Sequence, residues 1–129
     1  MTDRALRLVL DTSAMLSFVR QQVDVGELLA ELSDADAIAG LPLACLVDAS
    51  MTAVDRDRLE LLANHPATVI LGADEGDWRV LAELCALTGQ FSTASAAMAA
   101  LDAGCWVVSA RPWLYEQIGD GQLAIGVDD

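Results

Sequence analysis

The fold of this chain is decided by the stretch Leu8-Val9-Leu10-Asp11-Thr12-Ser13-Ala14-Met15-Leu16. An apolar run ends at Asp11, and two hydroxyl residues and a second apolar run follow at once. The pattern predicts a buried strand over residues 7–10 and a helix over residues 13–20, with Asp11 between them. Open α/β sheets place their ligand sites at the carboxyl ends of strands, so this carboxylate stands where such sites are built.

Strands and helices alternate along the rest of the chain. Further strands are predicted over residues 37–39, 68–71, 105–108 and 123–127. The predicted helices include one opening with Asp24 and Glu27 at capping-box spacing, one with Pro42 in its first turn, one closed by Gly89, and one over residues 92–103. Because the strands are apolar on both faces, the sequence predicts a single three-layer α/β/α domain over residues 1–129, with a mostly parallel sheet.

The composition favours a soluble protein with one core. The 129 residues are 54% hydrophobic, which is enough to bury a sizeable core. The mean hydropathy is +0.41, but acidic residues interrupt the longest apolar runs before they reach the roughly 18 residues of a membrane span. Charged residues near the N-terminus lead directly into the first strand, unlike a secretory signal. We therefore expect a cytoplasmic protein that has no membrane partner.

The charge balance restricts the partners. Seven basic residues stand against 20 acidic ones, and the net charge of −13 is spread along the chain. Such a surface repels phosphate backbones, because nucleic-acid affinity rests largely on Lys and Arg. Strong acidity suits solubility, and it also suits a basic protein partner. The three cysteines, Cys45, Cys85 and Cys105, lie in apolar stretches without a CxxC pair, which predicts reduced thiols rather than disulfides or a zinc site.

Two common classes of site lose their support because their motifs are missing. No GxGxxG follows the first strand and no GxxxxGKS/T occurs, so nucleotide binding of these types is not indicated. The one histidine, His65, lies beside Pro66 at an expected helix end, where a surface cap is the simpler role. A Ser-His-Asp triad has little to build on without a GxSxG motif. The remaining chemistry is that of carboxylates.

Four segments place acidic, hydroxyl or basic residues beside predicted elements. They are residues 9–16 with Asp11 and Ser13, residues 41–49 with Asp48, residues 91–101 with Ser92, and residues 106–115 with Arg111. In this order they resemble the motifs of the PIN-domain ribonucleases, a family that includes the toxins of bacterial toxin–antitoxin pairs. The likeness covers nearly the whole chain and implies a PIN-like fold.

The resemblance implies a metal site with an incomplete set of acids. Asp11 matches the first acid of the family, with Ser13 as its neighbouring hydroxyl, and Asp48 stands where the second acid is usually glutamate. Ser92 and Arg111 stand where the third and fourth acids are found. The family's acids hold Mg²⁺ or Mn²⁺, which activates a water for attack on the phosphate. Because negative charge is lost at two positions, we expect weak or absent divalent binding at Asp11 and Asp48, and no other cofactor.

Each candidate residue also has a structural interpretation. Asp11 can cap its helix and still belong to a vestigial site, and Ser92 is expected to be the N-cap of its own helix. Asp48 can be a solvated residue in the middle of a helix. Arg111 can point into the pocket and pair with Asp11 or Asp48 in place of a metal, or it can face solvent at the end of its strand.

Three functions follow from these alternatives. The favoured one is a catalytically impaired PIN-like protein that acts through protein–protein contacts. The second is an active Mg²⁺- or Mn²⁺-dependent ribonuclease acting on RNA, which tolerates the substitutions or recruits Asp74, Glu75, Asp77 or Glu116. The third is a cytoplasmic α/β binding module unrelated to nucleases. The resemblance also implies a homodimer.

Overall fold

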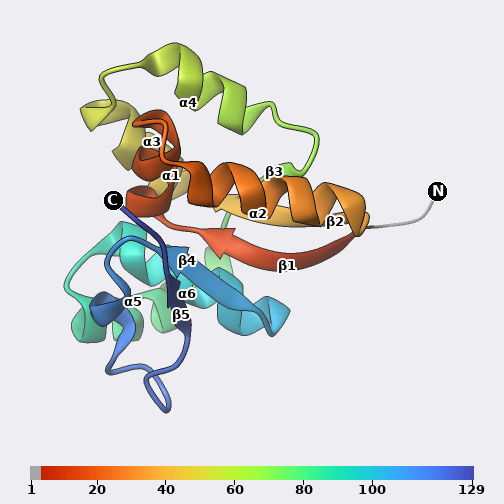
Figure 1. Cartoon of the computed structure of the whole chain (residues 1–129). Coiled ribbons are helices and arrows are strands. Elements are labelled where there is room, and N and C mark those ends of the chain that lie inside the picture. Colours follow the sequence, from red (N-terminus) through yellow and green to blue (C-terminus); the bar gives the residue numbers. More distant parts are fainter. Residues whose placement is uncertain (1–3) are drawn as a thin grey trace.

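The central sheet is five-stranded and all parallel. A computed structural model describes residues 4–129, and the first three residues of the predicted domain lie outside the described part. The strand order is β3-β2-β1-β4-β5 (Figure 1). The strands are β1 (Ala5–Leu10), β2 (Ala37–Pro42), β3 (Thr68–Leu71), β4 (Trp106–Ser109) and β5 (Ala124–Gly126). The predicted parallel sheet is therefore confirmed.

Helices cover both faces of this sheet. They are α1 (Thr12–Val19), α2 (Val23–Asp34), α3 (Leu43–Thr52), α4 (Arg56–Ala63), α5 (Trp78–Thr88) and α6 (Phe91–Ala103), with short 3-10 turns η1 (Glu75–Asp77) and η2 (Pro112–Tyr115). Figure 1 shows α1, α2 and α4 on one side and α5 and α6 on the other. Helix α3 contacts both α1 and α6, so it joins the two helical layers. The predicted three-layer α/β/α architecture is confirmed.

The core lies where β1 and β4 run side by side. Val9, Leu10, Val107 and Val108 are almost completely buried, and Leu10 is paired with Val108 in the register. Strands covered on both faces need apolar side chains at consecutive positions, which is the pattern that predicted them. Helix α6 packs against β1, β2 and β4. Its many alanines are small enough for the helix to lie close to the sheet.

Two predicted helix starts are wrong. Helix α2 begins at Val23 with Gln22 as its N-cap and no side-chain cap, so Asp24 and Glu27 form no capping box. The Asp24 carboxylate instead accepts a hydrogen bond from the backbone N–H of Asp128, 2.8 Å away. Strand β2 continues through Pro42, which is the N-cap of α3 and not a residue of its first turn. At Asp24 a tertiary hydrogen bond, and at Pro42 the pairing of β2 with β3, decides the local structure in place of the helix-start signal in the sequence.

Helix length also bears on membrane insertion. Within residues 4–129 no single helix is long and apolar enough to cross a membrane. The segments Glu75–Thr88 and Phe91–Ala103 are long and apolar enough only when taken together, and a bend of 118° separates them.

Candidate functional site

The carboxyl ends of the central strands bring most of the predicted site residues together. Asp11 follows β1, Arg111 follows the neighbouring β4, and β2 leads into α3, which carries Asp48. A cavity of about 280 Å³ opens here, and its walls include Asp11, Ser13, Asp48 and Arg111. Ser92 is not part of the wall, but it contacts Asp48 from α6. Residues from the four sequence segments therefore lie together at one edge of the sheet.

Asp11 is buried and accepts three hydrogen bonds. Its side chain is only 3% exposed. One carboxylate oxygen, Oδ1, accepts from the Ala14 N–H at 2.9 Å and from the Ser13 hydroxyl at 2.7 Å. The other oxygen, Oδ2, accepts from the Tyr115 hydroxyl at 2.8 Å. Asp11 is therefore the N-cap of α1, as expected, and a third donor reaches it from the distant turn η2.

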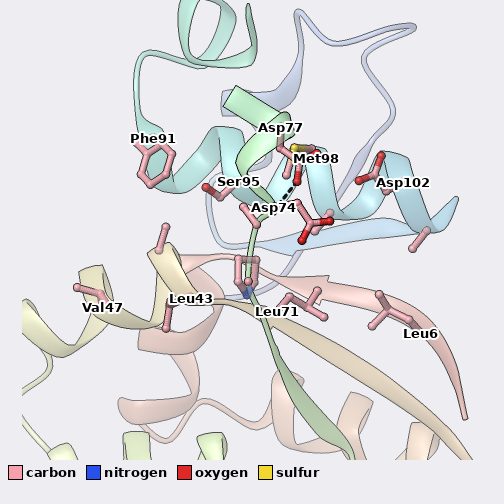
Figure 2. Close-up of a pocket in the computed structure, with 16 residues that line it drawn as sticks. Leu6, Leu43, Val47, Leu71, Asp74, Asp77, Phe91, Ser95, Met98 and Asp102 are labelled. Carbon is pink, nitrogen blue, oxygen red and sulfur yellow. Dashed lines mark hydrogen bonds between the residues drawn. The ribbon is translucent and has the colours of Figure 1, made fainter. Parts of the chain in front are cut away.

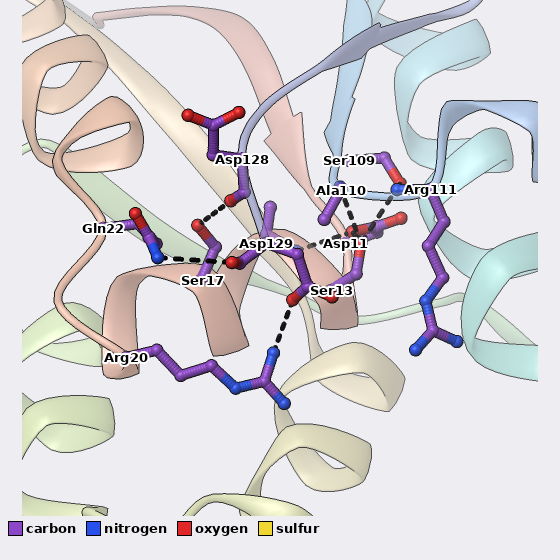
Figure 3. A network of polar contacts seen from close by, with 11 residues as sticks. Asp11, Ser13, Ser17, Arg20, Gln22, Ser109, Ala110, Arg111, Asp128 and Asp129 are labelled. Carbon is purple, nitrogen blue, oxygen red and sulfur yellow. Dashed lines mark hydrogen bonds and ion pairs between the residues drawn. The ribbon is translucent and has the colours of Figure 1, made fainter.

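A chain of hydroxyls extends from Asp11 to the end of β4 (Figure 3). The Ser13 Oγ accepts from the Ala110 N–H at 2.9 Å and lies 3.1 Å from the Ser109 Oγ. Because Ser13 gives its single proton to Asp11, Ser109 is the donor in the contact between the two serines. Ser109 in turn accepts from the Arg111 N–H at 2.9 Å. Of these groups only the Ser13 hydroxyl donates to Asp11 directly, and the other contacts hold Ser13 in place and join α1 to β4.

Asp48 and Ser92 connect α3 with α6. Asp48 is exposed, and its Oδ2 accepts a hydrogen bond from the Ser92 hydroxyl at 3.0 Å. The prediction that Ser92 caps its helix is wrong, because α6 begins one residue earlier and Gln90 is its N-cap. Nearby, the Cys45 thiol donates to the carbonyl of Ser92 at 3.1 Å. Burial and the negative charge of Asp11 raise the pKa of Cys45 from 9.0 to about 12, so this thiol stays protonated.

Arg111 does not pair with the acids of the cavity. Its side chain is exposed, and Figure 3 shows it extending away from Asp11. Across residues 4–129 the one ion pair is between Arg20 and Asp129, and both of these residues also line the cavity. The inward pairing considered for Arg111 is absent from this structure, and its solvent-facing alternative describes the observed position.

The segment after β5 forms part of the cavity wall and was not expected from the sequence. The Ser17 hydroxyl donates to the carbonyl of Asp128, and the Gln22 side chain donates to the carbonyl of Asp129 at 3.2 Å. Together with the Arg20–Asp129 ion pair, these contacts hold the segment against the end of α1 (Figure 3). Local sequence patterns do not predict contacts between residues that lie so far apart in the sequence.

The residues of this cavity do not fit the divalent ion that the PIN resemblance implies. Mg²⁺ takes near-octahedral oxygen ligands and is usually held by one or two carboxylates together with waters. Three of the roughly four lone-pair sites of the Asp11 carboxylate already accept hydrogen bonds, and Asp129 is paired with Arg20. In the part of the chain that the structure describes, no three His, Cys, Asp or Glu side chains gather as metal ligands do.

The acids considered as replacements lie elsewhere. Asp74 and Asp77 line a second, larger cavity of about 790 Å³ (Figure 2), and neither Glu75 nor Glu116 is part of the wall around Asp11. None of these four acids therefore lines the cavity around Asp11. The second cavity is mostly apolar and was not predicted.

The sequence matches no protein-family model, and no curated protein matches it. The resemblance to PIN-domain ribonucleases rests on the four sequence segments alone and stays a prediction.

Proposed function

We propose that this protein is a catalytically impaired, PIN-like protein that acts through protein–protein contacts. The observation that supports the proposal most is the state of Asp11. The Asp11 carboxylate has about four lone-pair sites, and three of them accept hydrogen bonds from Ser13, Ala14 and Tyr115, so it has little left to offer a cation. These donors stabilise a buried carboxylate without a metal and make it part of the scaffold.

The residues at the other three acid positions of the family, Asp48, Ser92 and Arg111, support the same proposal. Ser92 stands where the family has its third acid. Its hydroxyl binds no metal but donates a hydrogen bond to Asp48, and this bond occupies one lone pair of the Asp48 carboxylate. Arg111 places a fixed positive charge in the cavity wall, and Arg20 neutralises Asp129 there. Each of these features weakens the attraction of the cavity for a divalent cation. The acidic surface, with its net charge of −13, also disfavours RNA as a ligand.

Protein partners suit this surface better than RNA does. An acidic surface attracts basic proteins and accelerates their association. The homodimer that the resemblance implies is the other candidate assembly, and light scattering of the purified chain tests it. The cytoplasm remains the expected location.

The proposal is tested by a sensitive assay for RNA cleavage. A fluorophore-quencher RNA of mixed sequence is incubated with the purified protein in Mg²⁺, in Mn²⁺ and in EDTA. We expect no metal-dependent cleavage. Asp48→Asn is the matched variant, because Asp48 is exposed and its replacement leaves the fold intact. Metal-dependent cleavage that is lost in Asp48→Asn and in Asp11→Asn contradicts the proposal and favours the ribonuclease.

A further inference from the structure

We propose that the apolar groove formed by α3, α6 and the end of β3 binds an amphipathic helix of a cationic partner protein. The groove is the 790 Å³ cavity of Figure 2. This inference deepens the proposed function, on which it rests, by naming the docking surface and the chemistry of the partner.

The groove is apolar and open to solvent. Leu6 of β1, Leu71 at the end of β3 and Met98 of α6 contribute to its walls. Leu43 and Phe91 also line it, and they are 52% and 58% exposed. Figure 2 shows these side chains around one hollow, contributed by separate elements. Contiguous exposed apolar surface of this kind marks binding sites on soluble proteins.

The outer face of α3 extends the groove. Leu43, Val47 and Met51 are spaced four residues apart on this helix, and they are 52%, 53% and 77% exposed. A smaller hollow of about 350 Å³ contains Val47, Met51 and Phe91, so it continues the groove along α3. The opposite face of α3 buries Cys45 and Ala49. A helix that is apolar on both faces is normally covered on both, and ridges at four-residue spacing are the surface against which another helix packs.

The charges around the groove select a cationic partner. Asp74, Asp77 and Asp102 contribute to its walls, and no arginine or lysine is among the described residues that line it. Basic side chains on a docked helix would meet these carboxylates while its apolar face covers α3. A second copy of this chain is disfavoured, because it would bring three like charges against three, on two molecules that each carry −13.

The test uses a defined probe. It is a fluorescent leucine–lysine peptide of about four helical turns, with leucines on one face. Titration by anisotropy at physiological salt gives its affinity for the full chain. The matched peptide carries glutamate in place of lysine. We expect the lysine peptide to bind and the glutamate peptide not to bind, whereas equal binding of both overturns the choice of partner.

Matched variants separate docking in the groove from general attraction between opposite charges. Leu43→Ser should weaken binding by roughly fivefold or more. Leu61→Ser on α4, whose leucine is 56% exposed and lies outside the groove, should leave the affinity unchanged. Asp102→Asn should weaken binding about twofold to threefold, and the exposed Asp34 gives the control Asp34→Asn. Circular dichroism confirms that each variant folds.

Two further outcomes overturn the inference. One is equal loss of affinity in Leu43→Ser and Leu61→Ser, which means that the peptide binds the acidic surface at large. The other is a dimer in sedimentation that Leu43→Ser dissociates, which makes a second copy the occupant. Neither outcome changes the result expected in the RNA-cleavage assay. Groove binding together with metal-dependent RNA cleavage would refute the proposed function but would still support the groove as a docking site.

Discussion

Replacement of Tyr115 by phenylalanine tests whether Asp11 is a structural residue. The tyrosine is completely buried, and its hydroxyl is the donor to Asp11 Oδ2 at 2.8 Å. Tyr115→Phe keeps the ring and removes only this donor, so no cavity opens. A hydrogen bond to a charged group contributes about 1.5–3 kcal/mol, and a buried acceptor left without its donor is costly. We therefore expect the free energy of unfolding to fall by about 2 kcal/mol.

Urea denaturation followed by tryptophan fluorescence measures this loss. Ser50→Ala is the control, because its hydroxyl bond to the Val47 carbonyl lies on the surface and its loss should cost less than about 0.5 kcal/mol. In the Asp11→Asn background the cost of Tyr115→Phe should shrink by about 1 kcal/mol, since the acceptor is no longer charged. A loss in Tyr115→Phe no larger than in Ser50→Ala, or the same loss in both backgrounds, refutes a structural role for this contact.

Three further predictions concern pH, the arginine and the metal. The Cys45 thiol has its pKa raised to about 12 in the folded chain, so its contribution to stability is complete below pH 9 and declines by about 1.4 kcal/mol per pH unit above it. Denaturant melts at rising alkaline pH should show a shallower decline in Cys45→Ala. Arg111→Ala should change the free energy of unfolding by less than about 0.5 kcal/mol, since this side chain is exposed, and a loss above about 2 kcal/mol would indicate an inward pairing in solution. Calorimetric titration with Mn²⁺ should show no micromolar site, whereas such a site that disappears in Asp11→Asn would restore the metal to the cavity.

The sheet could be predicted because its signals are local. Strand β1 is apolar except for Arg7, β4 is apolar up to its last residue, Ser109, and β3 is a short run with β-branched residues between polar turns. The cap at Asp11 was also local, since Ala14 is three residues away. These features follow from neighbouring residues, so the sequence reveals them without knowledge of the rest of the fold.

The missed features depend on distant residues. The contact between Tyr115 and Asp11 spans 104 positions, and so does the one between Asp128 and Asp24 that replaces the expected helix cap. The direction of Arg111 depends on how η2 turns after β4. Convergence of Asp11 and Asp48 could be anticipated only through the family resemblance. Residue spacing does not predict which distant side chain will donate a hydrogen bond to a buried acceptor such as Asp11.

The partners of helix α1 set the order in which this chain can mature. Its first turn is completed by Tyr115, and its last turn is held by Asp128 and Asp129. The ribosome makes α1 roughly a hundred residues before these partners emerge, and a domain generally folds as a unit rather than one element at a time. Here the early helix holds a carboxylate that lacks one of its donors until the end of the sheet has been added. Co-translational folding should therefore leave α1 loosely docked and open to proteases or chaperones until late in synthesis, and the structure should close in one final, slow step.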